Sequence, residues 1–383
     1  MLKYLPLVLA GLWRKPVRTI LTFLSIMVAF ILFGIMASIE NGFAKQVDAA
    51  RLDRLYVDAR YGGPMPLAYR TRIASVPGVR AVIPVSNVFG YWKERRNLFG
   101  VIATNADYVV ARPEYTIDRP LLQKMERSRT GIIVSKAIAR RYNWKVGDRI
   151  PVTSPMTQQN GSNIWNFDIL AIADNRDLPD TATFALGSLK YLDEARTADR
   201  GTANRFLVRI PDEKRAVAVG RAIDRLFENS PKPTRTFSEK SSAQAGTSSL
   251  GSITFFTRSL IGAVLFMLLF ITGNTMMQSM RERIPEFAVL KTIGFSDRGV
   301  LALVFAEAVV LCGAAGLIGL AFVKLVVPLF RDGLPGNAGS LLLMPWSAAV
   351  TGFGFALLTA FISGFFPALR VSRMKLVDAL AGR

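Results

Sequence analysis

The sequence predicts a membrane protein with four transmembrane α-helices and a large mixed α/β extracytoplasmic domain between the first two of them. Two observations predict this class. The chain is 51% hydrophobic although it carries 48 basic and 28 acidic residues, so apolar and charged residues are expected to occupy separate segments. Four long runs are nearly free of charge, and the segment between the first two runs alternates between strand-like and helix-like patterns.

The four apolar runs define the predicted spans. They cover Thr19–Ile39, Ser259–Met280, Gly299–Val323 and Trp346–Phe366. A helix needs about 20 apolar residues to cross the hydrocarbon core of a bilayer, and each run supplies them. We therefore predict transmembrane helices at 19–40, 253–280, 299–323 and 346–369. The chain between them is expected to form a soluble domain at 41–252, a short loop at 281–298 and a second short loop at 324–345.

The first run has an alternative interpretation as a cleaved signal peptide. Its apolar part is longer than the roughly 7–15 residues usual for a signal peptide, and no clear cleavage site of small residues follows, so a retained anchor is favoured. The residues before it, 1–18, combine apolar side chains such as Trp13 with basic residues near Pro16. They predict a helix along the cytoplasmic interface, with a disordered leader as the alternative.

Basic residues beside the spans predict the orientation, because short loops rich in Lys and Arg stay in the cytoplasm. Such residues precede the first span, separate the second from the third and follow the fourth: Lys3, Arg14, Lys15, Arg18, Arg281, Arg283, Lys291, Arg298, Arg370, Arg373, Lys375 and Arg383. We expect both termini, the loop at 281–298 and the tail at 370–383 to be cytoplasmic. The domain at 41–252 is then expected on the opposite side of the membrane.

The segment at 41–252 predicts a mixed α/β domain followed by a linker. Runs of β-branched and aromatic residues predict strands at Arg54–Arg60, Val79–Val88, Asn97–Thr104, Trp165–Asp174 and Asn204–Ile210. Residues Gly131–Val152 predict a strand, a helix, a Gly-Asp turn and a strand. Residues Glu213–Asn229 predict an amphipathic helix with an apolar face of Ala216, Val219, Ile223 and Phe227. The polar segment Asn229–Ser252 is expected to be the linker back to the membrane.

The composition excludes several kinds of chemistry. There is no histidine, which removes His-based triads and His metal ligands, and the single cysteine, Cys312, lies in the third run. A membrane enzyme would need a carboxylate or Ser/Lys site, and the nearest acidic cluster, Asp174, Asp177 and Asp180, is interpreted as a solvated loop. The net charge of +20 comes from scattered basic residues without a nucleic-acid-binding motif. We expect contact with anionic membrane lipids and no nucleic-acid partner.

The loop between the second and third runs contains a short helix with clear end signals, in the stretch RERIPEFAVLKTIGF. Pro285 suits the first helical position, and Gly294 suits the left-handed residue that closes a helix. Glu286 in the first turn and Lys291 in the last turn match the helix dipole. The helix is therefore expected to run from Pro285 to Ile293.

The apolar side chains of this short helix predict a docking role. Phe287, Leu290 and Ile293 are expected to share one face. A helix of this length is not stable alone in water, so it needs a surface to dock on. The pattern leaves two surfaces open, the lipid interface and a cytoplasmic partner. Ser296 is expected to cap the next helix, which becomes the third span.

Residues inside the spans supply further candidates. Glu307 is the one acidic residue within a span, and an ionisable residue there is a functional hypothesis by default. It can bond to a neighbouring helix, take part in transmitting movement, or transfer a proton. Gly34 and Ser38, four residues apart in the first span, allow a close helix approach and are a candidate dimer contact. Ala315 and Gly319 have the same spacing in the third span.

Three stretches carry a family resemblance. RERIPEFAVLKTIGFSDRGVLALVFAEAVVL resembles the cytoplasmic loop and third span of the MacB/FtsX/LolC-type permeases of ABC transporters, through Glu286, Phe287, Val289, Leu290, Lys291, Ile293, Gly294 and Glu307. LWRKPVRTILTFLSIMVAFILFG resembles the family's first span, and FFPALRVSRMKLVDALAG resembles its ending. The block Gly131–Val152 resembles the core of the MacB-type periplasmic domain. Gly299 and Leu376 depart from the family pattern.

The resemblance implies a MacB-like permease subunit in a bacterial inner membrane, with the domain at 41–252 in the periplasm. The short helix would be the coupling helix that docks on a cytoplasmic ATPase, through Pro285, Glu286, Phe287, Leu290, Lys291, Ile293 and Gly294. Glu307 would lie on the path of transmission. The sequence has no G-x-x-x-x-G-K-[ST] motif. ATP and Mg²⁺ are therefore expected in the partner ATPase, with no cofactor and no catalysis in this chain.

The resemblance also implies further partners. A second copy of the permease is expected, with a homodimer favoured over a heterodimer. A periplasmic adaptor and an outer-membrane channel accompany some members, and the exported substrate would be an antibiotic, a peptide or a lipid-like molecule. Two alternatives remain within the family: a lipoprotein-releasing permease of the LolC/LolE type, and an FtsX-like signalling subunit that activates a cell-wall hydrolase.

Overall fold

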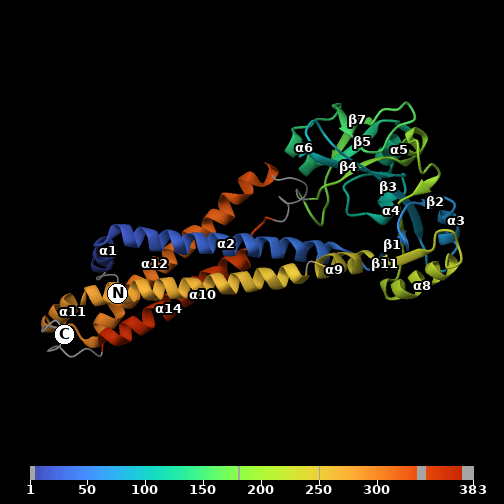
Figure 1. Ribbon diagram of the computed structural model, residues 1–383. Coiled ribbons are helices and arrows are strands. Elements are labelled where there is room, and N and C mark those ends of the chain that lie inside the picture. Colours follow the sequence, from blue (N-terminus) through green and yellow to red (C-terminus); the bar gives the residue numbers. More distant parts are fainter. Residues whose placement is uncertain (1–4, 180–181, 250, 334–341, 373–383) are drawn as a thin grey trace. The chain divides into compact units, whose positions relative to one another are not determined.

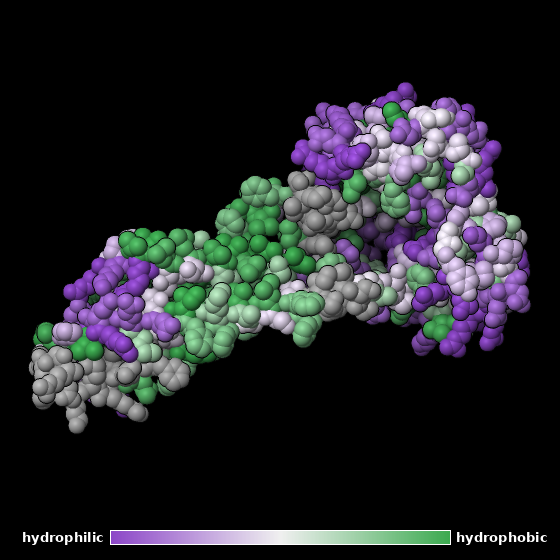
Figure 2. Space-filling model, in the orientation of Figure 1, coloured by the Kyte–Doolittle hydropathy of each residue, from purple (hydrophilic) through white to green (hydrophobic). Residues whose placement is uncertain are grey.

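The computed structural model describes residues 5–179, 182–249, 251–333 and 342–372, and the chain divides into two compact units. A helical unit comprises Met1–Gly42, Leu250–Phe330 and Leu341–Arg383, and a mixed α/β unit comprises Phe43–Ser249 and Arg331–Ser340. Hydrophobic side chains cover much of the helical unit, whereas the surface of the α/β unit is mostly hydrophilic (Figure 2). The predicted fold class is confirmed, with the α/β unit inserted between the first two long helices.

Within the described residues, four helices are long and apolar enough to cross a membrane, as predicted: α2 (Pro16–Ala49), α10 (Gly251–Glu282), α12 (Asp297–Leu325) and α14 (Trp346–Ser372). They exceed the predicted spans, most clearly α2, because polar residues after Glu40 continue the helix instead of ending it. Two short helices, α1 (Leu5–Trp13) and α11 (Ile284–Thr292), belong to the same unit (Figure 1). A 3₁₀ helix, η3 (Val327–Gly333), occupies part of the predicted loop at 324–345, and most of the predicted tail lies outside the described residues.

Small residues bring the long helices together. A Cβ atom on Gly319 of α12 would lie 2.6 Å from the backbone oxygen of Met27 on α2, and one on Gly316 would lie 2.6 Å from the Cβ of Ala356 on α14. Ala315 beside them is fully buried. The predicted packing role of Ala315 and Gly319 is confirmed, since close backbone approach between membrane helices needs small side chains.

The prediction of a dimer contact at Gly34 and Ser38 is wrong. Both residues are buried inside the helical unit, where a Cβ on Gly34 would lie 3.0 Å from the side chain of Val323 on α12. The Ser38 hydroxyl donates a 2.6 Å hydrogen bond to the Gly34 carbonyl oxygen of its own helix. The spacing of small residues correctly indicated a close helix neighbour, but the neighbour comes from the same chain.

The described strands of the α/β unit form a nine-stranded mixed sheet in the order β11-β1-β10-β3-β4-β8-β5-β7-β6. The pairs β4–β8 and β5–β7 are parallel, and the other neighbouring pairs are antiparallel. The bounds are β1 Arg54–Ala59, β3 Ala81–Tyr91, β4 Leu98–Thr104, β5 Gly131–Ser135, β6 Arg149–Thr153, β7 Ile164–Ala173, β8 Ala185–Ser188, β10 Arg205–Arg209 and β11 Thr234–Ser238, with a separate pair β2 Met65–Pro66 and β9 Thr202–Ala203. All five strands predicted singly and the strand–helix–turn–strand block are confirmed.

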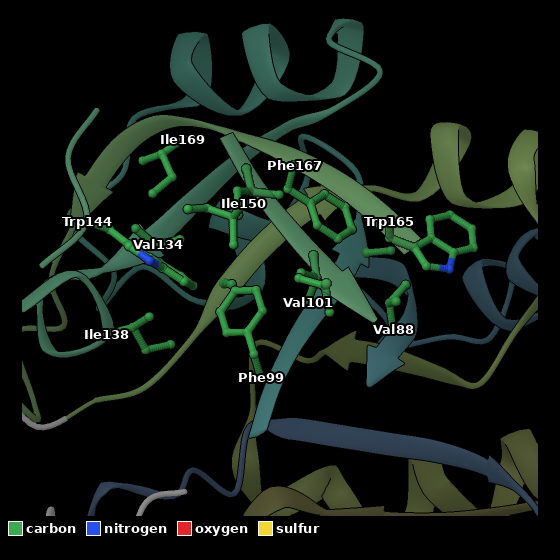
Figure 3. Packing of buried hydrophobic residues seen from close by; sticks show 14 of the residues in the cluster. Val88, Phe99, Val101, Val134, Ile138, Trp144, Ile150, Trp165, Phe167 and Ile169 are labelled. Carbon is green, nitrogen blue, oxygen red and sulfur yellow. The ribbon is translucent and has the colours of Figure 1, made fainter. Parts of the chain in front are cut away.

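Short helices pack beside the sheet: α3 Tyr69–Ala74, α4 Tyr108–Ala111, α5 Arg119–Arg127, α6 Lys136–Tyr142, α7 Leu189–Ala195, η2 Glu213–Arg215, α8 Ala216–Leu226 and α9 Glu239–Ser249. One core cluster gathers large side chains from β4, β7 and the turn after α6, including Phe99, Trp165 and Trp144 (Figure 3). Another lies under α8, whose predicted apolar face is buried as expected. Burial of these aromatic and aliphatic groups is the main stabilising contribution to the domain.

The prediction of a linker at 229–252 is wrong for most of its length. Thr234–Ser238 is the edge strand β11, paired antiparallel with β1, and Glu239–Ser249 is the helix α9. The strand is polar because Asp224 of α8 accepts hydrogen bonds from the hydroxyls of Thr234 and Thr236 and from the Thr236 backbone N–H. The polar composition predicted a linker, but the segment is a strand. Its polar side chains are hydrogen-bonded to Asp224 of α8, which lies 10 and 12 residues earlier in the sequence.

Candidate functional site

The helix α11 in the loop between α10 and α12 is the first part of the candidate site. It runs from Ile284 to Thr292, so Pro285 occupies its second position, one residue later than predicted. Gly294 has φ of 106°, and its N–H donates to the Lys291 carbonyl oxygen at 3.1 Å. The Phe295 N–H donates to the Leu290 carbonyl oxygen at 3.0 Å. These two bonds form the left-handed helix end predicted for Gly294.

The two faces of α11 differ in exposure. Phe287 and Ala288 are 2% and 3% exposed, and Phe287 packs in a cluster with Met280, Val300, Leu303, Val304 and Val8. Val289 and Ile293 are 50% and 72% exposed. The prediction that Ile293 shares the face of Phe287 is wrong, because six residues correspond to about 1.7 turns and place them on different sides. Leu290 lies between these faces and is half-buried.

Charged residues of α11 form ion pairs with neighbouring elements of the helical unit. Glu286 forms ion pairs with Arg14, in the turn after α1, and with Arg283. Lys291 Nζ lies 2.7 Å from an Asp297 carboxylate oxygen at the start of α12. These contacts hold the helix at both ends, in addition to the dipole interaction that the sequence predicted.

Arg283, the residue before α11, is joined to Glu307 of α12. Its Nη1 donates to the two Glu307 carboxylate oxygens at 2.7 and 2.8 Å. The side chains are 10% and 3% exposed, so the pair is largely shielded from solvent. The structure confirms the interpretation of Glu307 as a glutamate bonded to a neighbouring segment. In the sequence Arg283 indicates only the cytoplasmic side of the membrane, and its pairing with Glu307 was not predicted.

Gly11 of α1 covers this ion pair. A Cβ atom at this position would lie 2.5 Å from Glu307 Oε1 and 3.0 Å from each Arg283 Nη atom. Only glycine therefore lets the α1 backbone come so close to the pair. A cavity of about 30 Å³ adjoins Glu307, and its lining residues include Thr19, Thr22, Thr272, Thr275 and Ser279. A volume of this size is about that of one water molecule.

The corner between α1 and α2 is attached to the same region. Lys15 Nζ and Arg18 Nη1 lie 2.9 and 3.1 Å from Glu282 at the end of α10. Val8 is 2% exposed, whereas Trp13 is 66% exposed. The segment predicted as an interfacial helix therefore contains a helix that is docked on one side and presents an aromatic ring on the other. The way in which α1, α10, α11 and α12 pack around the Arg283–Glu307 ion pair could not be predicted from the spacing of residues in the sequence.

The described residues contain no group of three or more His, Cys, Asp or Glu that could hold a metal ion. Asp177 of the acidic cluster lies in a turn after β7, where its backbone N–H donates to the Asn175 side chain at 2.8 Å. Asp180 lies outside the described residues. Beside α11, Arg283 and Glu307 neutralise each other. The ion pairs around α11 hold helices in fixed positions.

A second buried network lies in the α/β unit, where α9 meets β1. Arg54 is fully buried and pairs with Glu114 at 2.7 Å and with Glu239, the first residue of α9, at 3.2 Å. Arg112 and the Tyr56 hydroxyl donate to Glu239 at 2.7 and 2.8 Å. Burial alone would raise the pKa of Glu239, but Arg112, Arg54 and Tyr56 outweigh it and hold that pKa below its usual value.

The Glu239 network connects the two ends of the α/β unit. β1 follows α2 in the chain, and α9 precedes α10, so the unit's entry and exit segments are fixed to each other. Loss of one partner from a buried ion pair of this kind strongly destabilises the folded protein, because the other charge is left buried and unpaired. No local pattern indicates the network, because its members are far apart in the sequence, with 127 residues between Arg112 and Glu239 and 183 between Tyr56 and Glu239.

Two family profiles match the chain. The profile described as FtsX-like permease C-terminal matches residues 258–376, and the profile described as MacB-like periplasmic core domain matches residues 19–226. The second match alone covers more than half of the chain. The first includes α11 and Glu307, and the second includes β1, Arg112 and Glu114.

Individual relatives agree with the profiles. A protein named an uncharacterized ABC transporter permease, from Mycobacterium tuberculosis, is 23% identical over 352 residues, which cover 89% of this chain and 90% of that one. The macrolide export ATP-binding/permease protein MacB of Neisseria meningitidis is 32% identical over 111 residues, 28% of this chain and 16% of that one.

Two solved structures resemble part of the chain. The periplasmic region of MacB from Actinobacillus actinomycetemcomitans matches 53% of this chain and 96% of its own length, with a TM-score of 0.39 and 8% identity. The extracellular domain of a noncanonic ABC-type transporter, YknZ, from Gram-positive bacteria matches 48% of this chain and 99% of its own length, with a TM-score of 0.36 and 10% identity.

Proposed function

This chain belongs to the MacB/FtsX-type family of ABC transporter permeases, and from that premise we propose that it transmits the ATP-driven movement of a separate cytoplasmic ATPase to its own α/β domain. The chain would be a non-catalytic subunit. ATP and Mg²⁺ would be bound and ATP hydrolysed in the partner, and the movement would drive export of an antibiotic, a peptide or a lipid-like molecule.

The division of α11 into two faces carries this proposal. The buried face, around Phe287, attaches the helix to its own chain, while Val289 and Ile293 remain exposed on the other side. Two exposed apolar side chains on a helix whose other face is fixed offer a contact surface for a partner. The ATPase would contact this outer face, so that a displacement of the ATPase displaces α11.

The ion pair between Arg283 and Glu307 would pass that displacement to α12. The two hydrogen bonds join the start of α11 to the middle of a long helix. Separating such a buried pair is costly, so α11 and α12 are expected to move together. In physical terms ATP binding would favour one of two arrangements of rigid helices.

The α/β domain would receive the movement as a rigid body. Its entry strand β1 and its exit helix α9 are joined through Glu239, Arg54 and Arg112. In this proposal both termini and α11 face the cytoplasm, and the domain lies in the periplasm. Two identical permeases would pair with two ATPases, and a periplasmic adaptor and outer-membrane channel would receive the substrate.

Site-specific photo-crosslinking tests the docking of α11. A photoreactive amino acid is placed at Val289, and at the buried Phe287 as a matched control, in the full chain in native membranes. We expect a cytoplasmic ATPase to be captured from Val289 and not from Phe287. Repeated capture of lipid alone from Val289, in a sample where the chain is folded and abundant, would show that α11 rests on the bilayer and would overturn the proposal.

A further inference from the structure

The α/β unit carries an open cavity of about 510 Å³ beside α8 and the edge strand β11. It is lined by Arg60, Tyr61, Arg221, Asp224, Arg225, Glu228, Pro233, Thr234 and Arg235. Figure 1 shows α8 beside the end of the sheet where β11 and β1 lie. Four guanidinium groups and two carboxylates give the lining a formal charge of +2. All lining residues of the cavity belong to the α/β unit.

The arginines of this cavity contrast with several others of the domain, whose charge is neutralised by an acid. These pairs are Arg70 and Arg119 with Asp107, Arg149 with Asp168, Arg205 with Asp58 and Arg209 with Asp53. In the part of the chain that the structure describes, no ion pair or hydrogen bond joins the side chains of Arg60, Arg221, Arg225 or Arg235 to an acid.

The acids in the lining do not neutralise these arginines through contacts. The Asp224 carboxylate accepts three hydrogen bonds from Thr234 and Thr236, at 2.7 to 3.0 Å, and is thereby directed to β11. Arg221 and Arg225 are four residues apart on α8, a spacing at which like charges destabilise a helix. The four arginines are exposed, so water screens their mutual repulsion, and they concentrate positive charge at one cavity where an anion can reach it.

We propose that this cavity binds the phosphate group of a small phosphorylated organic molecule. Guanidinium groups offer paired N–H donors that match the oxygens of phosphate, and several of them suit a doubly charged group better than a single carboxylate. The cavity volume is within the range of small-molecule sites and leaves room for an organic part beyond the phosphate.

Tyr61 supplies a contact for the organic part. It is 84% exposed and precedes Gly62 and Gly63, which have φ of 82° and 81°. A Cβ on Gly63 would lie 3.3 Å from Lys232 Nζ, so a fifth cationic group lies by the same turn. The phosphate can belong to a lipid headgroup or to a soluble phosphate ester, and these two sources share the chemistry that the cavity recognises.

Calorimetric titration of the full chain in nanodiscs of zwitterionic lipid tests this site. The probes are glycerol 3-phosphate, a soluble ester, and dihexanoyl phosphatidate, a short-chain lipid that presents the same phosphate. The variant is R221Q/R225Q. The control is R95Q/R200Q, which removes the same charge from two exposed arginines outside the cavity. Size-exclusion chromatography verifies that both variants remain folded.

We expect at least one probe to bind, and to bind about tenfold or more weakly to R221Q/R225Q than to the control, because charge-assisted hydrogen bonds are lost. Equal binding of both probes supports a soluble ester, and binding of the phosphatidate alone supports a lipid. Absence of binding by both probes, or equal weakening in the two variants, overturns the proposal. No ATPase is present, so the result is separate from that of the crosslinking experiment.

Discussion

Arg283 Nη1 donates hydrogen bonds to both carboxylate oxygens of Glu307, at 2.7 and 2.8 Å, and thereby joins the start of α11 to the middle of α12. Neither residue can be considered alone, because each shields the charge of the other in a region from which solvent is largely excluded. The backbone of α1 at Gly11 covers the pair. The pair is thus the point where three helices of the helical unit, α1, α11 and α12, meet.

Removal of one partner is expected to destabilise the chain strongly. Glu307→Ala leaves a buried guanidinium without its carboxylate, which costs about 3–5 kcal/mol of unfolding free energy. The double variant R283Q/E307Q has no buried charge and is expected to lose less than the sum of the two single glutamine variants. Unfolding of the purified chain in one detergent, followed by tryptophan fluorescence, completes this double-mutant cycle. Additive losses would mean that the two side chains are not coupled.

One half of this site is evident from the sequence. Glu307 is conspicuous because it is an acid in an apolar run, and the ends of α11 carry proline and glycine signals that are read locally. Arg283 and Gly11 carry no such signal, since their contacts depend on how α1, α11 and α12 pack. For the same reason Gly34 indicated a close helix neighbour without identifying it as α12 of the same chain.

The α/β unit shows the same limit. Strands with alternating apolar residues were predicted, whereas β8 and β11 were not, because β8 has only four residues and β11 is polar. The polar strand is stabilised by Asp224, and the Arg54–Glu239 contact joins residues that are far apart in sequence. Local patterns thus predict elements, while buried polar networks depend on tertiary contacts.

Gly11→Ala tests the close approach of α1. The added methyl group would lie 2.5 Å from Glu307 Oε1, so the helix or the carboxylate has to shift. We expect a lower apparent unfolding temperature in detergent and weaker stimulation of the partner ATPase. Gly262→Ala is the matched control, since no atom lies within 4 Å of its added Cβ and alanine favours a helix. Identical behaviour of the two variants would refute a role for the contact at Gly11.

Acid should weaken the Glu239 network. The folded-state pKa of Glu239 is held below the usual value of 4.5, so its ion pairs contribute stability above that pH and lose it as the pH falls through the lower folded value. Glu239→Gln is expected to be less stable than the natural chain at pH 7, with the difference shrinking below pH 4.5. Chemical unfolding across this pH range measures the difference.

The control for Glu239 is Glu94→Gln. The side chain of Glu94 is 58% exposed, and its partner Arg96 is 79% exposed, so their pair contributes little. Its stability profile should follow that of the natural chain at every pH. A difference between the Glu239→Gln variant and the natural chain that stays constant below pH 4.5 would contradict the assignment of the acid-sensitive charge to Glu239.

Gly294→Ala tests how the end of α11 is fixed. The residue has φ of 106°, and an added Cβ would meet no atom within 4 Å, so any cost comes from the backbone conformation alone. That cost is about 1 kcal/mol or more for a residue with a Cβ. We expect faster hydrogen exchange in the last turn of α11, where Gly294 and Phe295 donate to Lys291 and Leu290, and weaker capture of the ATPase.

Gly299→Ala separates this backbone effect from a general effect of alanine. Gly299 lies in the first turn of α12, where its added Cβ would have ordinary contacts at 3.5 Å and where alanine favours the helical conformation. In the Gly299→Ala variant the backbone amides of α11 should exchange hydrogen at the same rate as in the natural chain. If both variants exchanged alike, the left-handed residue would not be what ends α11, and the exposed face around Val289 would be positioned by packing of Phe287 alone.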